Sequence, residues 1–196
     1  MAIKYLKKAN KTPLTDEHKT RTTVQNILYD IEKRREEGIK EITKENFSKY
    51  GDLLSKDNIK PIDINNGYAK RFDSLANVDI LKNNGQTNIS IFQALKRSLP
   101  MQIDMMEKHP EGSQAFIPLK ETIFFVFVAP IGEKPDINSL ESFLISKGMG
   151  INYKPGIWHF PLISTENMDF LVVDRKGAGE NLIIHNFKKK KIILET

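Results

Sequence analysis

QAFIPLKETIFFVFVAP, residues 114–130, is the stretch that decides the fold class of this chain. Two apolar runs lie on either side of the polar pair Lys120-Glu121. Each run has the length of a strand, and two strands separated by a short polar connection predict a hairpin. The second run, Ile123 to Val128, is apolar without interruption, which is typical of a strand buried on both faces.

Strand-like segments and turn signals continue on both sides of this stretch. The dipeptides Asn66-Gly67 and Asn84-Gly85 favour tight turns. Residues 139–148, SLESFLISKG, are predicted to form a short helix that ends at Gly148. Further strands are expected in INYKPGIWHFPL (151–162), MDFLVVDRKG (168–177) and NLIIHNF (181–187). Many short strands at roughly even spacing predict a mainly β chain, folded as a closed barrel or a sandwich.

The first 41 residues have a different character. Apolar residues recur at helical spacing between residues 24 and 31, so residues 15–41 are predicted to form a helix with one apolar stripe, and Gly38 is a plausible stop. We therefore expect a helical N-terminal extension over residues 1–41 and a β domain over residues 42–196.

Composition narrows the function classes. The chain has 196 residues, with 30 Lys and Arg against 25 Asp and Glu, so its net charge is +5. The basic residues gather near both ends and do not alternate with aromatic residues, which argues against a nucleic-acid partner. No apolar run reaches the roughly 18 residues of a membrane span, and no secretory signal is visible, so no membrane partner is expected. The chain has no cysteine, and a cytoplasmic location is the default expectation.

Two segments hold the residues best suited to chemistry. His109 and Gln114 lie around a Pro-Glu-Gly turn at the entrance of a predicted strand. Strand alternation places Ile157 and His159 on one face, and Trp158 and Phe160 on the other. From spacing alone, His159 is as compatible with a satisfied core histidine as with a catalytic group, and Trp158 is a typical core residue.

Several motifs in one order resemble the ureidoglycolate lyase family. They are INNGYAKRFDSLANVDIL (64–81), ISIFQALKRSLP (89–100), MMEKHPEGSQAFIPL (105–119), KPDINSLESFL (134–144), GMGINYKPGIWHFPL (148–162) and MDFLVVDRKGAGEN (168–181). The resemblance implies a cupin-like, double-stranded β-barrel that forms a homodimer. It also implies an enzyme that splits ureidoglycolate into glyoxylate and urea, a late step of allantoin breakdown.

The implied substrate needs a proton acceptor for its hydroxyl group, a donor for the departing urea and an anchor for its carboxylate. The resemblance assigns the acid or base role to His159, because an imidazole titrates near neutrality. Lys154 is expected either to bind the carboxylate of the substrate or to donate a proton. The expected substrate-binding residues are the urea-binding pair Gln114 and Asn65, the alternative carboxylate anchor Arg71, His109 at the mouth, and the walls Phe116, Tyr153 and Trp158.

No cofactor is expected, although many cupin pockets hold a divalent metal, for which His109, Gln114 and His159 would be the ligands. The sequence departs from the usual pattern of the family at Lys154, Phe160 and Gln93. These departures leave a second hypothesis open, namely a non-catalytic cupin that binds a small carboxylate as a sensor or regulator.

The beginning of the chain shows a second resemblance. AIKYLKKANKTP (2–13) and VQNILYDIEKRREEGIKE (24–41) are similar to the start of histidinol dehydrogenase-like proteins. The glycine-rich region and the metal ligands of those proteins have no counterpart here, so this resemblance implies no activity.

Overall fold

The computed structural model describes residues 38–98, 100–187 and 192–194 of the chain. The predicted N-terminal helix lies outside the described residues up to residue 37. From residue 38 onward the chain forms one compact unit made mainly of β-strands. Its helical parts are the single turn α2 (Lys44–Phe47) and the 3₁₀ turns η2 (Asn65–Gly67), η3 (Lys82–Asn84) and η4 (Ile137–Ser139).

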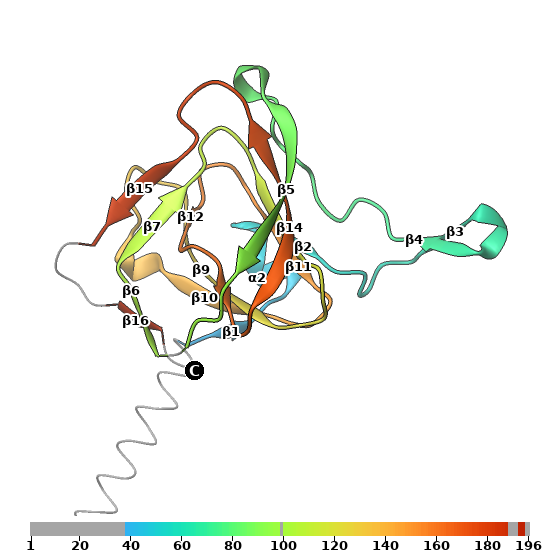
Figure 1. Cartoon of the computed structure of the whole chain (residues 1–196), viewed down its shortest axis with the longest axis horizontal. Coiled ribbons are helices and arrows are strands. Elements are labelled where there is room, and N and C mark those ends of the chain that lie inside the picture. Colours follow the sequence, from blue (N-terminus) through green and yellow to red (C-terminus); the bar gives the residue numbers. More distant parts are fainter. Residues whose placement is uncertain (1–37, 99, 188–191, 195–196) are drawn as a thin grey trace, which may run out of the picture. The chain divides into compact units, whose positions relative to one another are not determined.

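Two sheets make up the body of this unit (Figure 1). The larger sheet has the order β1 (Lys40–Glu41), β10 (Glu141–Ile145), β9 (Phe124–Ala129), β12 (Trp158–His159), β7 (Met105–Lys108) and β15 (Ile183–Asn186), and β13 (Ile163–Ser164) also pairs with β9. The second sheet has the order β2 (Gly51–Leu54), β11 (Gly150–Tyr153), β8 (Gln114–Pro118), β14 (Met168–Lys176) and β5 (Gln86–Ala94). Two small pairs complete the fold, β16 (Ile192–Leu194) with β6 (Met101–Ile103), and β3 (Ile62–Ile64) with β4 (Ala69–Arg71). Within the described residues, neither sheet closes on itself.

Strand β9 is buried on both faces, as its uninterrupted apolar run predicts. Phe124, Val126 and Val128 face a core shared with the second sheet, where Phe170 and Ile151 also lie. The intervening residues of β9 face a second apolar cluster on the outer side of the larger sheet, with Ile103, Met106, Trp158 and Phe160. Because its alternate residues lie in different clusters, β9 joins the two cores. Each buried aromatic or aliphatic side chain of this kind contributes about 1.5–3 kcal/mol to stability by leaving water.

The predicted hairpin of residues 114–130 is wrong. β8 pairs with β11 and β14 in the second sheet, whereas β9 pairs with β10, β12 and β13 in the larger one. The connection around Lys120-Glu121 therefore crosses from one sheet to the other. Strand signals locate both strands, but the partner of each is chosen by long-range packing.

One helix prediction is wrong, and the expected end of a second helix is also wrong. Residues 141–145 form strand β10, with Phe143 and Ile145 fully buried in the core between the sheets. Their pairing with β9 lets Phe143 and Ile145 reach the core, and a helix of about ten residues is unstable on its own. The predicted helix over 15–41 does not extend to its expected end, because Lys40 and Glu41 form strand β1 beside Phe143 and Leu144.

A thin arm projects from this body (Figure 1). It consists of β3, η2 and β4, and the predicted Asn66-Gly67 turn lies at its tip. Asn65, Asn66 and Gly67 all have positive φ angles there, which asparagine and glycine tolerate better than other residues. Tyr68, next to the turn, is 93% exposed.

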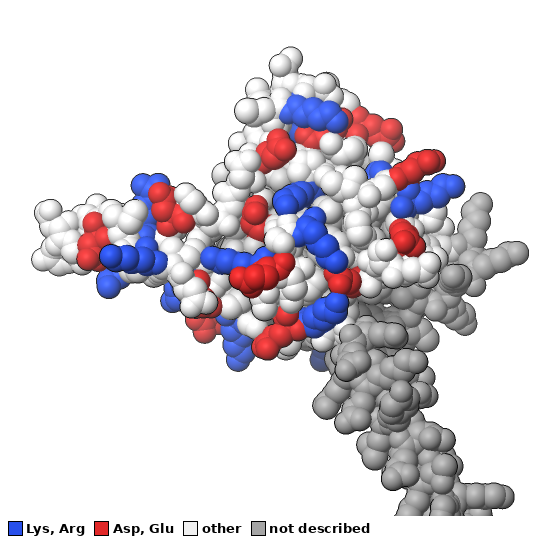
Figure 2. All heavy atoms as spheres, turned by 180° about the vertical axis from the view of Figure 1, so that it is seen from behind, with Lys and Arg blue, Asp and Glu red and all other residues white. Residues whose placement is uncertain are grey.

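The surface carries mixed charge. In the view of Figure 2, lysine and arginine side chains alternate with aspartate and glutamate over both the body and the arm. The described helices include none that is long and apolar enough to cross a membrane.

Candidate active site

A cavity of about 720 Å³ lies between the two sheets. The larger sheet contributes Glu107 and His159, and the second sheet contributes Gln114, Tyr153 and Asp174. The remaining wall comes from three groups: the end of β5 with the residues after it (92–97), the aromatic and apolar residues Phe116, Phe160, Pro161, Leu162 and Leu182, and His109 after β7. Polar side chains on an otherwise apolar surface of this volume are typical of a small-molecule site.

His159 lies at the bottom of this cavity and is only 2% exposed. Its Nδ1 is 3.1 Å from the carbonyl oxygen of Ile157. Since a carbonyl oxygen only accepts, Nδ1 carries the ring proton and Nε2 keeps its lone pair. That Nε2 is buried and has no hydrogen-bond partner among the described residues. Burial, and then the charge on His109, lower the pKa of His159 to about 3 despite the hydrogen bond to Ile157. The ring is therefore a neutral proton acceptor at neutral pH.

Glu107 faces His159 because the two residues are directly opposite in the pairing of β7 with β12. Glu107 Oε1 lies 3.6 Å from His159 Nε2. Burial raises the pKa of the Glu107 carboxyl, and the charge on His109 only partly offsets this. The contact is therefore not an ion pair: a neutral imidazole faces a carboxyl group that holds its proton to higher pH than usual.

His109 completes the cluster from the turn after β7. Its ring centre is 5.3 Å from that of His159, and its Nδ1 contacts the carbonyl oxygen of Asn181. As for His159, the carbonyl oxygen can only accept, so Nδ1 of His109 is the donor in this contact. Glu107, His109 and His159 each offer one atom that could bind a metal, and these three atoms lie within 4.8 Å of one another.

Two imidazoles and one carboxylate are a donor set that suits a divalent transition metal. The backbone carbonyls that hold both Nδ1 protons act as the outer partners that metal-binding histidines need. The buried, unpartnered Nε2 of His159 is consistent with such a role. The residues present therefore fit a metal ion, and Glu107 rather than the expected Gln114 is the third candidate ligand.

Aromatic rings form one wall of the site. Tyr153 stacks on His159 with ring centres 4.5 Å apart and an angle of 14° between the planes. Phe116 meets Tyr153 edge-on, and Phe92 meets Phe116 in the same way. Burial raises the pKa of the Tyr153 hydroxyl, so it stays protonated. The wall limits solvent around His159 and holds its ring plane.

Two further groups of polar side chains lie along the cavity. Asp174 Oδ1 accepts a hydrogen bond from Asn88 Nδ2 at 2.9 Å, and its Oδ2 accepts one from Gln114 Nε2 at 3.5 Å. Lys96 and Arg97 lie on the segment after β5, and the Arg97 guanidinium is 5.1 Å from the centre of the Phe160 ring. The cavity thus combines a carboxylate–amide group, a histidine–glutamate cluster and a cationic group.

Comparison with known proteins agrees with the motifs. The family model described as "Ureidoglycolate lyase" matches residues 37–195. The chain is 40% identical over 159 residues to the ureidoglycolate lyase of Pseudomonas syringae pv. tomato, a match that covers 80% of this chain and 94% of that protein. It is 41% identical over 157 residues to the ureidoglycolate lyase of Pseudomonas fluorescens, with 80% and 94% covered. The chain belongs to the ureidoglycolate lyase family.

The family match does not extend to the beginning of the chain. It starts at residue 37, and the comparisons do not support the resemblance of the N-terminal residues to histidinol dehydrogenase-like proteins. The helical stripe expected there lies outside the described residues.

Of the nine site residues that the resemblance implied, the structure brings five together in the cavity. They are His109, Gln114, Phe116, Tyr153 and His159. The other four lie elsewhere. Lys154 is exposed, and its Nζ donates to the carbonyl oxygen of Ser48. Trp158 faces the outer cluster of the larger sheet, as strand alternation predicts, and its Nε1 donates to the carbonyl oxygen of Gly132.

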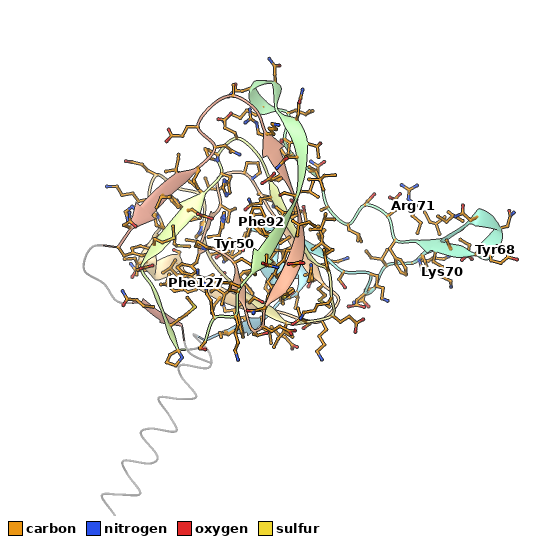
Figure 3. The ribbon with its side chains drawn as sticks, viewed as in Figure 1. Tyr50, Tyr68, Lys70, Arg71, Phe92 and Phe127 are labelled. Carbon is orange, nitrogen blue, oxygen red and sulfur yellow. The ribbon has the colours of Figure 1, made fainter. Side chains whose placement is uncertain are left out.

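Asn65 and Arg71 lie on the arm, in η2 and β4. Arg71 is labelled there in Figure 3. Both are exposed, and Arg71 pairs with Asp73 at 2.8 Å rather than with a cavity residue. Within the single described chain, neither lines the cavity.

Sequence reasoning missed Glu107, Asp174, Lys96 and Arg97. Glu107 is two residues before His109, so alternation alone places both on one strand face, and this signal was available. Asp174 and Arg97 gave no comparable signal, because they reach the cavity only through the pairing of β14 with β8 and β5 and through the path of the chain after β5. Two positions where the chain departs from the usual family pattern, Phe160 and Gln93, line the cavity, whereas the third, Lys154, does not.

Proposed function

We propose that this protein is a ureidoglycolate lyase that cleaves the carbon–nitrogen bond of ureidoglycolate and releases urea and glyoxylate, in allantoin and purine catabolism. The membership of the chain in this family supports the reaction. The observation that carries the mechanism is the contact between the buried His159 Nε2 and the Glu107 carboxyl group, 3.6 Å apart in the cavity. Burial raises the pKa of that carboxyl group, which favours its role as the proton donor.

The reaction needs one proton to leave the substrate hydroxyl group and one to reach the departing nitrogen. His159 Nε2 accepts the hydroxyl proton as the oxygen–carbon bond becomes the carbonyl of glyoxylate and the carbon–nitrogen bond breaks. The Glu107 carboxyl group donates its proton to that nitrogen, which leaves as urea. The proton on His159 then returns to the Glu107 carboxylate across the short gap between them, so the enzyme starts the next cycle unchanged.

The substrate carboxylate needs a cation. We assign this role to Arg97 in place of Lys154 and Arg71, because Arg97 lines the cavity and its guanidinium lies over the Phe160 ring. A planar guanidinium offers two parallel N–H donors to a carboxylate. The contact with the Phe160 ring supports this orientation of the guanidinium. Lys96 adds positive charge beside it.

We propose that the reaction runs without a resident cofactor, since side chains of the cavity account for both proton transfers. A divalent metal, if one binds, would be held by Glu107, His109 and His159. It would polarise the substrate hydroxyl group. Exhaustive chelation followed by assay separates the two cases: full turnover supports the metal-free reaction, and turnover that returns only with added metal contradicts it.

The test of the function is release of glyoxylate and urea from ureidoglycolate by the purified protein. Equal amounts of both products at a rate far above the uncatalysed one are expected. A protein that only binds small carboxylates would instead show ligand-dependent melting shifts without either product.

We further propose a cupin-like barrel, formed by the two facing sheets, and a cytoplasmic homodimer. The absence of cysteine from the sequence is compatible with a reducing compartment. The arm supports the dimer, because Ile62, Ile64 and Tyr68 expose apolar surface on a two-stranded hairpin. Such a hairpin is marginal in water without further packing. A second copy of the chain, related by two-fold symmetry, would cover it.

A further inference from the structure

Asp174 lies at one end of the cavity, within a set of polar residues that the proton transfers do not use. It faces the cavity from β14, between Gln114 on β8 and Asn88 on β5. Asn88 is its directly opposite residue in the pairing of β14 with β5. Gln114 is only 6% exposed, and its Nε2 donates to Asp174 rather than to solvent.

These hydrogen bonds orient the acceptors. Each carboxylate oxygen of Asp174 receives one amide N–H, from Asn88 on one side and from Gln114 on the other. A carboxylate offers about four acceptor sites, so acceptor capacity remains on the side open to the cavity. Gln114 Nε2 points toward Asp174 at 3.5 Å, and within the described residues the carbonyl oxygen and second N–H of Gln114 have no recorded partner, so they can meet a ligand.

We infer that Asp174, oriented by Gln114 and Asn88, is the group that recognises the ureido end of the substrate and excludes analogues with an anionic group at that position. The inference rests on the proposed function, and it adds which part of the substrate Asp174 recognises, namely the ureido group. A ureido group carries N–H donors and one carbonyl acceptor. Asp174 accepts from the terminal NH₂, and the free N–H of Gln114 donates to the carbonyl oxygen.

The same arrangement gives selectivity. A dicarboxylate would place a second negative charge beside the Asp174 carboxylate, and the two like charges would repel each other. An analogue without N–H groups would leave the Asp174 carboxylate partly unpaired, and a site built to hydrogen-bond a missing group rejects such ligands strongly. The cationic group at Arg97 is assigned to the carboxylate that ureidoglycolate and its simpler analogues share, so Arg97 and Asp174 test different parts of the ligand.

The test compares two non-reacting ligands. N-carbamoylglycine carries both the ureido group and the carboxylate, whereas glycolate carries the carboxylate and hydroxyl but no ureido group. Asp174→Asn is expected to weaken competitive inhibition by N-carbamoylglycine, and to raise KM for ureidoglycolate, by about tenfold. Inhibition by glycolate should be unchanged. Gln114→Met, which keeps the size of the side chain and removes its amide, should give a smaller selective loss of the same ligand.

Asp169→Asn is the matched control, since Asp169 lies on the same strand but outside the cavity and contacts Gln93 at 3.4 Å. It should leave both inhibition constants unchanged. Equal weakening of both ligands by Asp174→Asn, or unchanged binding of N-carbamoylglycine, would overturn the inference. If the native protein releases no glyoxylate at all, the proposed function fails instead, and that result is read before any variant is compared.

Discussion

The two histidines of the cavity differ in what their surroundings allow them to do. His159 is buried between the Tyr153 ring and the Ile157 carbonyl, so it stays neutral with its Nε2 lone pair free. A buried lone pair without a partner costs stability and persists where a ligand or substrate completes it. His109 is partly exposed and held by the Asn181 carbonyl, so it lies at the edge of the cluster.

Replacing His159 by Asn removes the hydroxyl proton acceptor and keeps a polar side chain in the buried position. Turnover is expected to fall by about 10²–10⁴-fold, the usual contribution of a positioned base. Lys154→Met should keep near-native turnover, because Lys154 is exposed and lies outside the cavity. Steady-state glyoxylate release measures both variants. If Lys154→Met is inactive while His159→Asn is active, the assignment of roles is reversed.

Replacing Glu107 by Gln should separate activity from stability. Glu107 has a raised pKa in the folded state, so its contribution to stability is present at low pH and is lost as pH rises through that pKa. The neutral Gln avoids the cost of a buried carboxylate, so the variant should melt at a higher temperature than the native protein at pH 8 and at nearly the same temperature at pH 4. Turnover should fall about 10²-fold or more, because Gln donates no proton to the leaving nitrogen.

Melting curves at the two pH values, with glyoxylate release at each, measure this prediction. The native protein should also lose activity on the alkaline side as Glu107 deprotonates, and Glu107→Gln should lack that limb. A variant that melts lower at pH 8 would show instead that the carboxylate stabilises the fold.

The sequence predicted the site residues that lie in continuous motifs. KHPEGSQ and the Trp-His pair placed His109, Gln114 and His159 on strand faces or turns correctly. Asp174 enters the site through pairing between distant strands, which local pattern does not specify, whereas the two-residue spacing of Glu107 and His109 is a local signal. Two of the four residues that lie outside the cavity, Lys154 and Arg71, are cations near a turn whose direction depends on the path of the chain.

At the level of elements, the strands were recognised better than their partners. Alternation and uninterrupted apolar runs identified β8, β9, β11, β14 and β15. The register and the sheet to which each belongs depend on contacts far along the chain, as the separation of β8 from β9 shows. The segment over residues 139–148 reads as a helix by its spacing of apolar residues and becomes β10 because both of its faces are covered.

Strand β10 is also tied to its neighbours through Glu141. This side chain accepts hydrogen bonds from Tyr50 and Lys40, each at 2.6 Å, and pairs with Lys49 at 2.8 Å. Burial alone would raise the pKa of Glu141, but these three partners outweigh it and lower the pKa to about 2. The carboxylate therefore joins β1, β10 and the turn before β2.

Replacing Glu141 by Gln should destabilise the protein by about 2 kcal/mol at neutral pH, because the charged partners lose their acceptor. A depressed pKa contributes stability above its ordinary value of 4.5, and that contribution is lost as pH falls toward 2. The native protein and the variant should therefore converge in stability over this acid range. Urea unfolding at pH 7, 4.5 and 3 measures it, and a difference that stays constant across these values would contradict the assignment. Glu133→Gln, at an exposed position, serves as the control.

For the whole molecule, the sequence predicted a mainly β chain, and that prediction is confirmed. The arm could not be foreseen, since its turn signal is the same as that of any hairpin and only the fold shows that it leaves the body (Figure 1). Apolar residues also remain exposed on the outer face of the second sheet, where Ile89 is 67% and Ile91 is 55% exposed. Exposed apolar side chains on a sheet face and on the arm are typical of interaction surfaces.

Removing the arm tests the homodimer directly. Ile62 and Arg71 are paired across the arm, so two glycines can join Pro61 to Phe72 without moving the body. The native chain is expected to have a solution mass of twice 22.5 kDa, and the shortened chain is expected to be a monomer. Light scattering after size-exclusion chromatography measures both.

Replacing Tyr68 by Ser and Ile62 by Asn keeps the arm and removes its apolar surface, so dissociation of this variant shows that burial of those side chains drives association. A shortened chain that remains a dimer would move the interface to another surface, and a native protein that is monomeric at every concentration would contradict the homodimer itself.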